Sequence, residues 1–279
     1  NMALNLGAIG KKTAPIEFNY DEDMVILYAL GIGSGTEELD YVYEKNLKVF
    51  PTFSSILCRP ALVSLMMEAN VNRSAVLHGE QEVTIYKAIP AKGKVFSSGV
   101  LSSVYDKGDM GAVLNMDIET SDEQNQLILK SKVVIVDRSA GNFGGDRGPK
   151  SPKYDPPHGS NPDFCVKHVV SRDQSALYRL SGDKNPLHID PDFAKTKGFD
   201  QPILHGLCSF GFACRAILES VCENDPEKLK SLSVRFMGVV YPRDTLITKG
   251  WEIIKGTYNM QTMTQDGRLV LGNIRATIK

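Results

Sequence analysis

The sequence has no cysteine pattern of the kind that indicates a disulfide framework or a zinc site. Its cysteines are odd in number and form no CxxC pair. This usage fits a reducing compartment better than an oxidising one. We therefore expect no bound metal and five thiols in or near the core, at Cys58, Cys165, Cys208, Cys214 and Cys222.

The sequence also lacks an excess of charge of either sign. It has 32 lysines and arginines against 33 aspartates and glutamates, which gives a formal net charge of -1. Such a balance produces no extended field to attract nucleic acid or an anionic membrane surface. We expect no nucleic-acid partner, and an anionic ligand would have to be bound by a local group of basic side chains.

No segment has the pattern of a membrane span. The most apolar long stretch, ILHGLCSFGFACRAILESVC at 203–222, carries His205, Arg215 and Glu219. These polar residues favour a buried helix over a membrane span. With 279 residues, 42% of them hydrophobic, the chain is long enough for one large core or two coupled cores of ordinary domain size.

What the sequence does contain is an internal repeat. Strand-like segments separated by short polar turns fill 81–136 and again 232–278, and an apolar helical segment precedes each run, at 60–71 and 203–222. Between the runs, 139–163 is rich in Gly, Pro and Ser and has no hydrophobic period. This order predicts an α+β fold with two copies of one unit, each a helix wrapped by an antiparallel β-sheet. The predicted division is 1–145, a linker at 146–163, and 164–279.

Most of the residues suited to chemistry lie in one short segment, YRLSGDKNPLHID at 178–190. Pro186 disfavours the α conformation at Asn185, so Asp183 and His188 should lie on an irregular loop and not on a helix face. A carboxylate beside an imidazole holds the ring in one tautomer and sets its basicity near neutral pH. The Asn185 amide can hold a water or a carboxylate between them.

Directly downstream, His205 and Gly206 open the apolar helix. Backbone N–H groups at a helix start are unpaired and partly positive, and a glycine there lets a ligand oxygen approach closely. Each residue alone has an ordinary structural explanation, as a cap, a turn residue, a buried histidine or a packing glycine. Taken together, with no serine or cysteine pair suited to the histidine, they favour proton transfer at an activated carbonyl group.

The segments LSGDKNPLHID and FDQPILHGLCSFG closely resemble the hydratase 2 motif of the MaoC-like family. Similarity extends from about residue 15 to the end and includes LYALGIG, VLHGEQ and VYDKG. The resemblance implies a double hot-dog fold and a homodimer. It also implies reversible hydration of trans-2-enoyl-CoA to (3R)-3-hydroxyacyl-CoA in peroxisomal fatty-acid β-oxidation.

By the same resemblance, Asp183, Asn185 and His188 match the catalytic residues and Gly206 matches the oxyanion-hole glycine. The second half would carry catalysis, while the first, which has no counterpart of SGDKNPLH, would accommodate the acyl chain. No cofactor is implied, because coenzyme A is part of the substrate. The positions that match substrate-contact residues are His78, Gly79, Lys107 and Phe236.

Three alternatives remain open on the sequence. A (3R)-hydroxyacyl thioester dehydratase of fatty-acid synthesis would use the same residues, whereas a hot-dog thioesterase would direct water at the carbonyl carbon. A non-catalytic acyl-CoA-binding module would be favoured if Asp183 or His188 were missing, and both are present. Fusion to a dehydrogenase domain is a further expectation from the resemblance. Because RATIK is not an SKL-type address, a peroxisomal location is expected from the resemblance alone.

Overall fold

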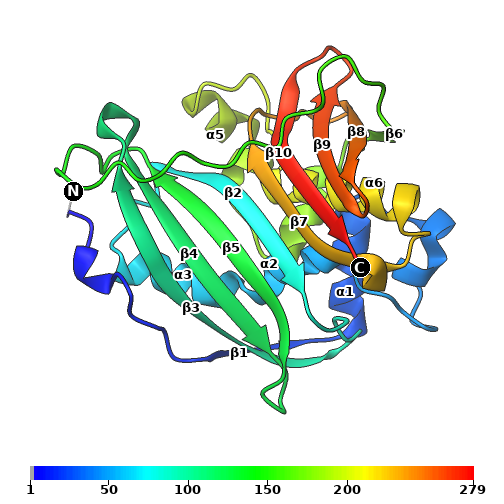
Figure 1. The fold of residues 1–279 in the computed structure, drawn as a ribbon, viewed down its shortest axis with the longest axis horizontal. Coiled ribbons are helices and arrows are strands. Elements are labelled where there is room, and N and C mark those ends of the chain that lie inside the picture. Colours follow the sequence, from blue (N-terminus) through cyan, green and yellow to red (C-terminus); the bar gives the residue numbers. More distant parts are fainter. Residues whose placement is uncertain (1–2) are drawn as a thin grey trace.

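One antiparallel sheet of ten strands forms the frame of the computed structural model, which describes residues 3–279 (Figure 1). The strands are β1 (Ile16–Tyr20), β2 (Val76–Ile85), β3 (Gly93–Asp106), β4 (Ala112–Ser121), β5 (Leu127–Asp137), β6 (Phe164–Val169), β7 (Leu229–Phe236), β8 (Thr245–Ile254), β9 (Thr257–Thr264) and β10 (Leu269–Ile278). Their order across the sheet is β1-β3-β4-β5-β2-β7-β10-β9-β8-β6.

The strand order confirms the predicted repeat. Read outward from the β2–β7 junction, one half runs β2-β5-β4-β3-β1 and the other β7-β10-β9-β8-β6. The two sequences of strands correspond one to one, and β2 pairs antiparallel with β7 through Glu80–Arg235 and the following residues. The chain therefore has the predicted α+β, double hot-dog fold, with both copies joined into a single sheet.

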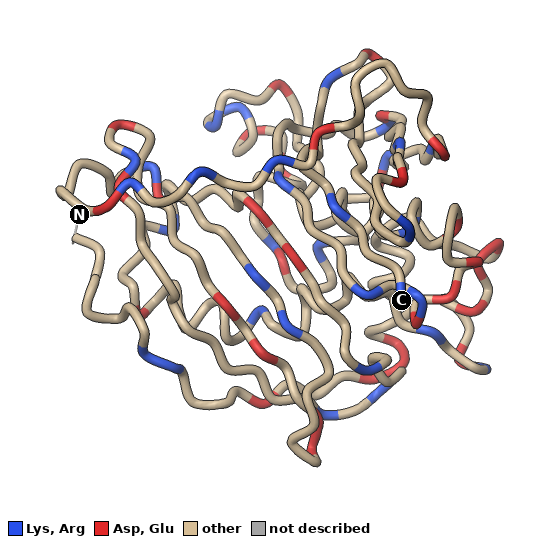
Figure 2. Tube along the Cα trace, viewed as in Figure 1, with Lys and Arg blue, Asp and Glu red and all other residues tan. Residues whose placement is uncertain are grey.

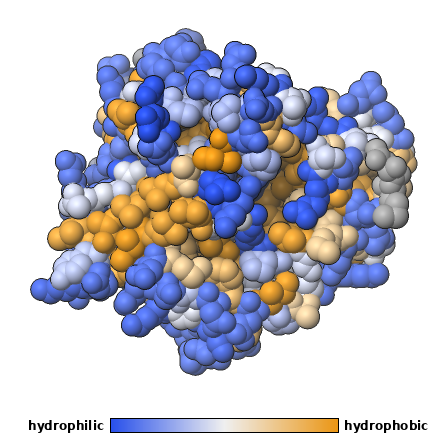
Figure 3. Space-filling view, turned by 180° about the vertical axis from the view of Figure 1, so that it is seen from behind, coloured by the Kyte–Doolittle hydropathy of each residue, from blue (hydrophilic) through white to orange (hydrophobic). Residues whose placement is uncertain are grey.

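The main helices lie behind the sheet as drawn in Figure 1. Of the two predicted helices, the one in the first half packs on β1, β3 and β4, and the one in the second half on β6, β7, β8 and β10. On this side of the molecule hydrophobic side chains gather in a broad band between hydrophilic regions (Figure 3). Within residues 3–279, no helix has the length and apolar character that crossing a bilayer requires. The helices are α1 (Glu22–Gly31), α2 (Ser54–Leu57), α3 (Arg59–Glu68), α4 (Gln174–Tyr178), α5 (Pro191–Thr196) and α6 (Gly206–Val221).

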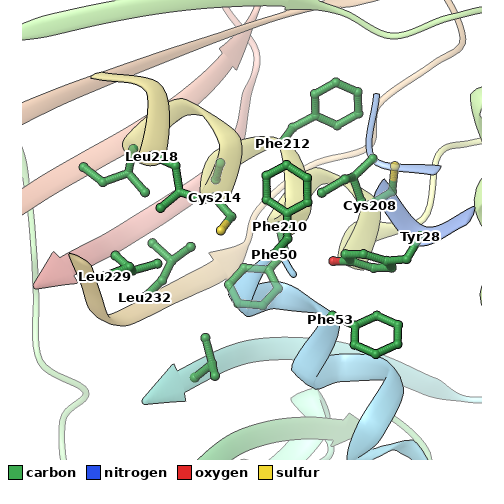
Figure 4. Close-up of a cluster of buried hydrophobic side chains, with 14 of the residues drawn as sticks. Tyr28, Phe50, Phe53, Cys208, Phe210, Phe212, Cys214, Leu218, Leu229 and Leu232 are labelled. Carbon is green, nitrogen blue, oxygen red and sulfur yellow. The ribbon is translucent and has the colours of Figure 1, made fainter. Parts of the chain in front are cut away.

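Two hydrophobic clusters form the core, and the larger one joins the halves. Phe210 and Phe212 of α6 pack with Phe50, Phe53 and Tyr28 from the first half (Figure 4). Each such aromatic side chain stabilises the fold by roughly 1.5–3 kcal/mol when it is fully buried. The smaller cluster lies wholly within the first half, between α3 and strands β3, β4 and β5. The helix of the second half is thus held in place by side chains of the first.

The segment between the halves is irregular but well anchored. Residues 138–163 contain no helix or strand. They include the segment 146–163, whose role as a linker between two domains stays a prediction. The segment crosses the outer face of the sheet (Figure 1), where Asn273 Nδ2 donates to Pro152 O at 2.9 Å and Trp251 Nε1 donates to Ser160 O at 3.0 Å. The Arg275 guanidinium lies 3.9 Å from the centroid of the Tyr154 ring.

Charges on the outer face of the sheet alternate in sign from strand to strand (Figure 2). Glu80 and Glu82 of β2 stand beside Lys130 and Lys132 of β5, and Asp117 and Glu119 of β4 follow. Ion pairs join neighbouring strands, for example Lys130 with Glu119 at 3.0 Å. As the composition indicates, this face carries no extended field of one sign.

The structure corrects three details of the sequence analysis. Strands β1 and β6 were not predicted, because each is a short edge strand with a single neighbour in the sheet. Strand β2 begins at Val76, five residues before the predicted segment at 81. Cys165 is exposed on the edge strand β6, so the expectation of five core thiols is wrong at that position, while the other four are buried.

Candidate active site

The loop between α4 and α6 is folded by its own polar side chains. Asn185 has an extended conformation (φ -56°, ψ 124°) and caps the 3-10 turn Pro186–His188, as the following proline predicts. Its Oδ1 accepts from the Leu187 N–H at 3.0 Å, and Asp183 Oδ1 accepts from the Asn185 N–H at 3.2 Å. Within residues 3–279, Asp183 Oδ2 and the Asn185 NH2 group have no other partner, so both remain available to a ligand.

His188 is held in one tautomer. Its Nδ1 lies 2.8 Å from the carbonyl oxygen of Ile203. Because a carbonyl only accepts, Nδ1 carries the proton and Nε2 keeps its lone pair. Burial lowers the pKa of His188 below 6.5, while the Ile203 carbonyl and the nearby Asp183 carboxylate oppose this change. At neutral pH the ring is therefore mainly neutral and can accept a proton at Nε2.

His205 lies next to His188 and Asp183. The sequence analysis noted it only as a polar residue of the segment 203–222 and as the residue before Gly206. Its side chain is 2% exposed, and its ring stacks on that of His188 with centroids 3.7 Å apart. His205 Nε2 donates to the backbone carbonyl of Asp183 at 3.0 Å. Burial and the adjacent His188 lower the pKa of His205 to about 4. His205 thus contacts two of the predicted catalytic residues, Asp183 and His188, as a neutral ring.

Asp183, His188 and His205 are close enough together to be compared with a metal site. One ligand atom from each lies within 4.8 Å of the others. Two imidazoles that bind one ion must direct their in-plane lone pairs at a common point. Here the rings are stacked at an interplanar angle of 27°, so their in-plane lone pairs do not converge on one point. The arrangement suits proton transfer better than a metal site, and the expectation of no metal stays a prediction.

An open helix start lies next to the paired histidines. Gly206 is the first residue of α6, and no side chain caps this end. Within residues 3–279 the Gly206 N–H has no acceptor. A Cβ atom at this position would lie 3.0 Å from Cδ1 of Phe236, closer than side chains normally approach. The glycine therefore keeps the helix start against the Phe236 ring and leaves its N–H open to a ligand oxygen.

Two predicted substrate-contact residues, His78 and Phe236, meet across the junction of the halves. Their rings pack edge to face with centroids 4.9 Å apart. Gly79 lies at a β-bulge between His78 and Glu80 in the pairing of β2 with β5, and such bulges re-aim neighbouring side chains. Burial lowers the pKa of His78 to about 4, and Gln81 Oε1 lies 3.0 Å from its Nε2.

Lys107, the remaining predicted contact residue, lies apart from the others. It stands in the turn after β3, and β4 and β5 separate β3 from β2 in the sheet. Its ammonium group donates to the Arg147 carbonyl and lies 5.7 Å from the Tyr105 ring centroid. The structure thus gathers the other predicted residues around α6 and the loop, while a role for Lys107 stays a prediction.

An apolar cavity of about 190 Å³ adjoins the loop on the side of the first half. Ser181 and Gly182 form one wall, directly before Asp183. Apart from the neighbouring Leu180, the rest of the wall comes from the first half, including Phe18, Phe53 and Ile56. The polar loop of the second half therefore opens toward hydrophobic side chains of the first.

Comparisons with known proteins agree with this architecture. A family model described as the MFE-2 hydratase 2 N-terminal domain matches residues 18–139, and the MaoC-like domain model matches residues 153–271. The "Probable enoyl-CoA hydratase 2" of Dictyostelium discoideum is 40% identical over 97% of this chain and 95% of its own length.

Two further relatives are longer than this chain. The structure of full-length peroxisomal multifunctional enzyme type 2 from Drosophila melanogaster superposes with a TM-score of 0.80 and 33% identity, over 95% of this chain and 48% of that one. The "Peroxisomal hydratase-dehydrogenase-epimerase" of Neurospora crassa is 37% identical over 98% of this chain and 31% of its own length. In that relative the matching unit is fused to a dehydrogenase. The chain belongs to the hydratase 2 group of the MaoC-like family.

Proposed function

We propose that this chain catalyses the reversible hydration of trans-2-enoyl-CoA thioesters to (3R)-3-hydroxyacyl-CoA in fatty-acid β-oxidation. The observation that carries the proposal is the placement of a neutral His188, with Nε2 free, beside the Asp183 carboxylate and the open start of α6. The similarity to a protein named enoyl-CoA hydratase 2 over nearly the whole chain supports the same reaction.

The reaction needs a hydrogen-bond donor that stabilises the negative charge formed as water adds. In an enoyl thioester the double bond is conjugated with the carbonyl group, so addition of water at the β-carbon moves negative charge to the thioester oxygen. The Gly206 N–H can donate to that oxygen. Loss of one such donor typically slows an enzyme by about 10²–10³-fold. Gly206 is therefore as important to the proposed reaction as Asp183 and His188, the two side chains that transfer protons.

Asp183 and His188 supply the proton transfers. One of them removes a proton from water as the C–O bond forms at the β-carbon, and a proton is returned to the α-carbon, so the site regains its original protonation after each turnover. The Asn185 amide can donate to the same water and orient it. His205 contacts the His188 ring and the Asp183 backbone, as a positioning residue. The reverse sequence of the same steps is dehydration.

Several further properties belong to the proposal. The acyl chain occupies the apolar cavity in the first half, and no cofactor is required beyond the coenzyme A of the substrate. Lys107 and the basic residues near it bind phosphates of coenzyme A, because a local cluster is sufficient for that role. We also propose a homodimer and a peroxisomal location, the latter supported by relatives whose names include "peroxisomal".

The nearest alternative is a biosynthetic dehydratase that acts on chains attached to an acidic carrier protein. Such an enzyme needs a basic docking surface. The outer face of the sheet alternates acidic and basic strands (Figure 2), so this face does not favour that alternative. A thioesterase would direct water at the carbonyl carbon and release free thiol. Because an N–H donor on the carbonyl oxygen serves both reactions, the products separate these two candidates.

The test is direct. Purified protein should remove the absorbance of the conjugated thioester in trans-2-decenoyl-CoA and crotonyl-CoA, and chiral analysis should give the 3R alcohol without release of free thiol. Asp183→Asn should abolish turnover. Asp192→Asn, at a 95% exposed side chain of α5, is the matched control and should behave like the wild type. Thiol release, 3S product or an active Asp183→Asn variant would each rule out the proposal.

A further inference from the structure

A buried amide lies against His78 at the junction of the two halves. The Gln81 side chain is 1% exposed, and its Oε1 lies 3.0 Å from Nε2 of His78. On a regular strand, residues three positions apart point to opposite faces. The bulge at Gly79 adds one residue to β2, so His78 and Gln81 point to the same face. The bulge therefore brings this amide and this ring together.

Gln81 determines which nitrogen of His78 carries the proton. Because an amide oxygen only accepts, the proton is on Nε2 and the lone pair is on Nδ1. Burial lowers the pKa of His78 to about 4, so the ring is neutral near pH 7. Within residues 3–279, His78 Nδ1 forms no hydrogen bond, and it is not enclosed as the Nδ1 atoms of His168 and His205 are. His78 therefore offers an accessible acceptor.

The position of His78 indicates which part of a substrate this acceptor meets. The Phe236 ring contacts both His78, with centroids 4.9 Å apart, and Gly206, where Cδ1 lies 3.0 Å from the place a Cβ would occupy. Neither His78 nor Phe236 lines the cavity proposed for the acyl chain. A thioester whose oxygen is bound by the Gly206 N–H and whose acyl chain enters that cavity would therefore direct its sulfur side toward His78.

The sulfur side of an acyl-CoA carries a hydrogen-bond donor close to the thioester. Two methylene groups separate the sulfur from the first amide of coenzyme A, and the N–H of this amide needs an acceptor when water is displaced. A neutral imidazole with its lone pair on the accessible nitrogen accepts such an N–H. The opposite tautomer, or a protonated ring, would present a second donor to it.

Building on the proposed hydratase function, we infer that His78 Nδ1 accepts the first amide N–H of coenzyme A, and that Gln81 is the positioning residue that keeps the lone pair on this nitrogen. Gln81 does not touch the substrate and acts through His78. Gly206 then binds the thioester oxygen while His78 fixes the arm on the sulfur side. Loss of Gln81 should therefore act on KM and not on the proton transfers of Asp183 and His188.

The experiment compares two small substrates that differ only in this donor. They are S-crotonyl-N-acetylcysteamine and its isostere, the crotonyl thioester of 2-mercaptoethyl acetate, in which an ester oxygen replaces the amide N–H. For the wild type, kcat/KM for the amide should exceed that for the ester by about fivefold to tenfold, as expected for one neutral hydrogen bond.

Three variants test the role of Gln81. Gln81→Leu should lose the preference through a higher KM for the amide and change turnover of the ester little. His78→Phe keeps a ring against Phe236 without an acceptor and should lose the same preference. The double variant should be no worse than His78→Phe, since both residues act on one contact. Thr248→Val, which removes a buried hydrogen bond to Thr262 in the second half, is the matched control and should keep the wild-type ratio.

Nitrogen-15 NMR reads the tautomer in the wild type, without any substitution at Gln81. The spectrum of His78→Phe identifies the signals of His78 among those of the five histidines. The expected result is a protonated Nε2 and an unprotonated Nδ1. Three results would overturn the inference: a protonated Nδ1, equal kcat/KM of the wild type for amide and ester, or a Gln81→Leu variant impaired equally on both.

The saturated analogues, S-butyryl-N-acetylcysteamine and its ester isostere, separate this inference from the proposed function, because their binding needs no turnover. The amide should shift the Nδ1 signal of His78, and the ester should not. If this difference is seen but neither enoyl thioester is hydrated, the hydratase function fails and the inference on His78 and Gln81 stands. If both enoyl thioesters are hydrated equally and Nδ1 does not respond, the inference fails and the hydratase function stands.

Discussion

The two halves of this molecule share a strand order but differ in what surrounds their helices. In the second half, α6 has sixteen residues and is buried over the continuous stretch from Cys208 to Leu218. In the first half, α3 has ten residues, of which only Ala61 and Leu65 are buried. A polar loop with Asp183 and His188 precedes α6, whereas the 3-10 turn Pro51–Phe53 and the short α2 precede α3. The second half therefore has polar side chains before the start of its helix, whereas the first half lines a cavity.

This difference shows how a duplicated fold can divide its functions. Because α6 is covered by Phe50, Phe53 and Tyr28 of the first half, its start is held rigidly without help from a cap (Figure 4). The first half has no comparable polar loop to support, so the same region can instead be lined by apolar side chains next to Ser181 and Gly182. Under the proposed function, the second half holds the reacting carbons and the first half the acyl chain.

The largest expected effect separates two histidines, one from each half. His188→Gln in the second half should lower kcat by about 10³-fold, because general acid–base groups contribute 10²–10⁴-fold. His78→Gln in the first half should act mainly on KM, since His78 packs edge to face on Phe236 and lies outside the loop that carries Asp183 and His188. Steady-state kinetics with trans-2-decenoyl-CoA measures both. A loss of kcat at His78 equal to that at His188 would contradict the division between the halves.

The next effect is on stability at acidic pH. The pKa of His205 is about 4 in the folded protein instead of about 6.5. Between these values the unfolded chain binds a proton that the folded chain does not, so the free energy of unfolding should fall as the pH drops from 6.5. For His205 alone the decrease should reach about 3 kcal/mol at pH 4.

Denaturant titrations from pH 4 to pH 8 measure this dependence. His205→Gln keeps a donor for the Asp183 carbonyl but cannot titrate, so it should flatten the curve below pH 6.5. His78→Gln in the first half should flatten it by a similar amount, because burial also lowers the pKa of His78 to about 4. Parallel curves for the wild type and His205→Gln would show that the stacked pair does not control acid stability.

A third pair of substitutions compares the glycine at the start of α6, Gly206, with a glycine that faces α3, Gly99. Gly206→Ala should push the Phe236 ring and obstruct the approach of the thioester oxygen, and lower kcat by about 10²-fold. Gly99→Ala in β3 would place a methyl group 2.7 Å from Leu65 Cδ1 of α3. This overpacking should cost about 1–3 kcal/mol of stability and leave kcat unchanged. Thermal unfolding measures the stability of both variants, and steady-state kinetics measures their kcat. A loss of kcat in Gly99→Ala together with a loss of stability alone in Gly206→Ala would contradict the prediction.

Much of the fold could be predicted from periodicity and turn signals. The strands β3, β4, β5, β8, β9 and β10 were predicted as parts of the two strand-like runs, 81–136 and 232–278, because each alternates apolar and polar residues between Pro, Gly or Asp turns. The edge strands β1 and β6 were not, since each is only five or six residues long and half its side chains face solvent. The repeat was visible in the order of elements, but the pairing of β2 with β7 depends on contacts distant in sequence.

The candidate site was predictable only where its residues are close in sequence. Asp183, Asn185 and His188 share one loop, so a local pattern revealed them. His205 lies seventeen residues after His188, and the stacking of the two rings depends on how α6 returns to the loop. The cavity residues Phe18, Phe53 and Ile56 are more than a hundred residues away and look like ordinary core residues. Their position beside the loop follows from the packing of the first half against the second.

The smallest expected effect concerns the segment that joins the halves. In the second half, Arg275 lies 3.9 Å from the Tyr154 ring centroid and holds the segment on the sheet. In the first half, Lys130 lies 5.9 Å from the ring centroid of Tyr86, which is 55% exposed. Cation–π contacts contribute about 0.5–1 kcal/mol at exposed sites and weaken with distance.

Tyr154→Ala should therefore lower the free energy of unfolding by about 1 kcal/mol, and Tyr86→Ala by about half as much or less, with turnover unchanged in both. Denaturant unfolding at neutral pH measures the difference. If Tyr154→Ala has no effect while hydrogen exchange on β9 and β10 stays slow, the segment is held by its backbone contacts with Asn273 and Trp251. If it also lowers kcat, the segment helps to hold the second half in its active form, and the two halves are more closely coupled than their shared core requires.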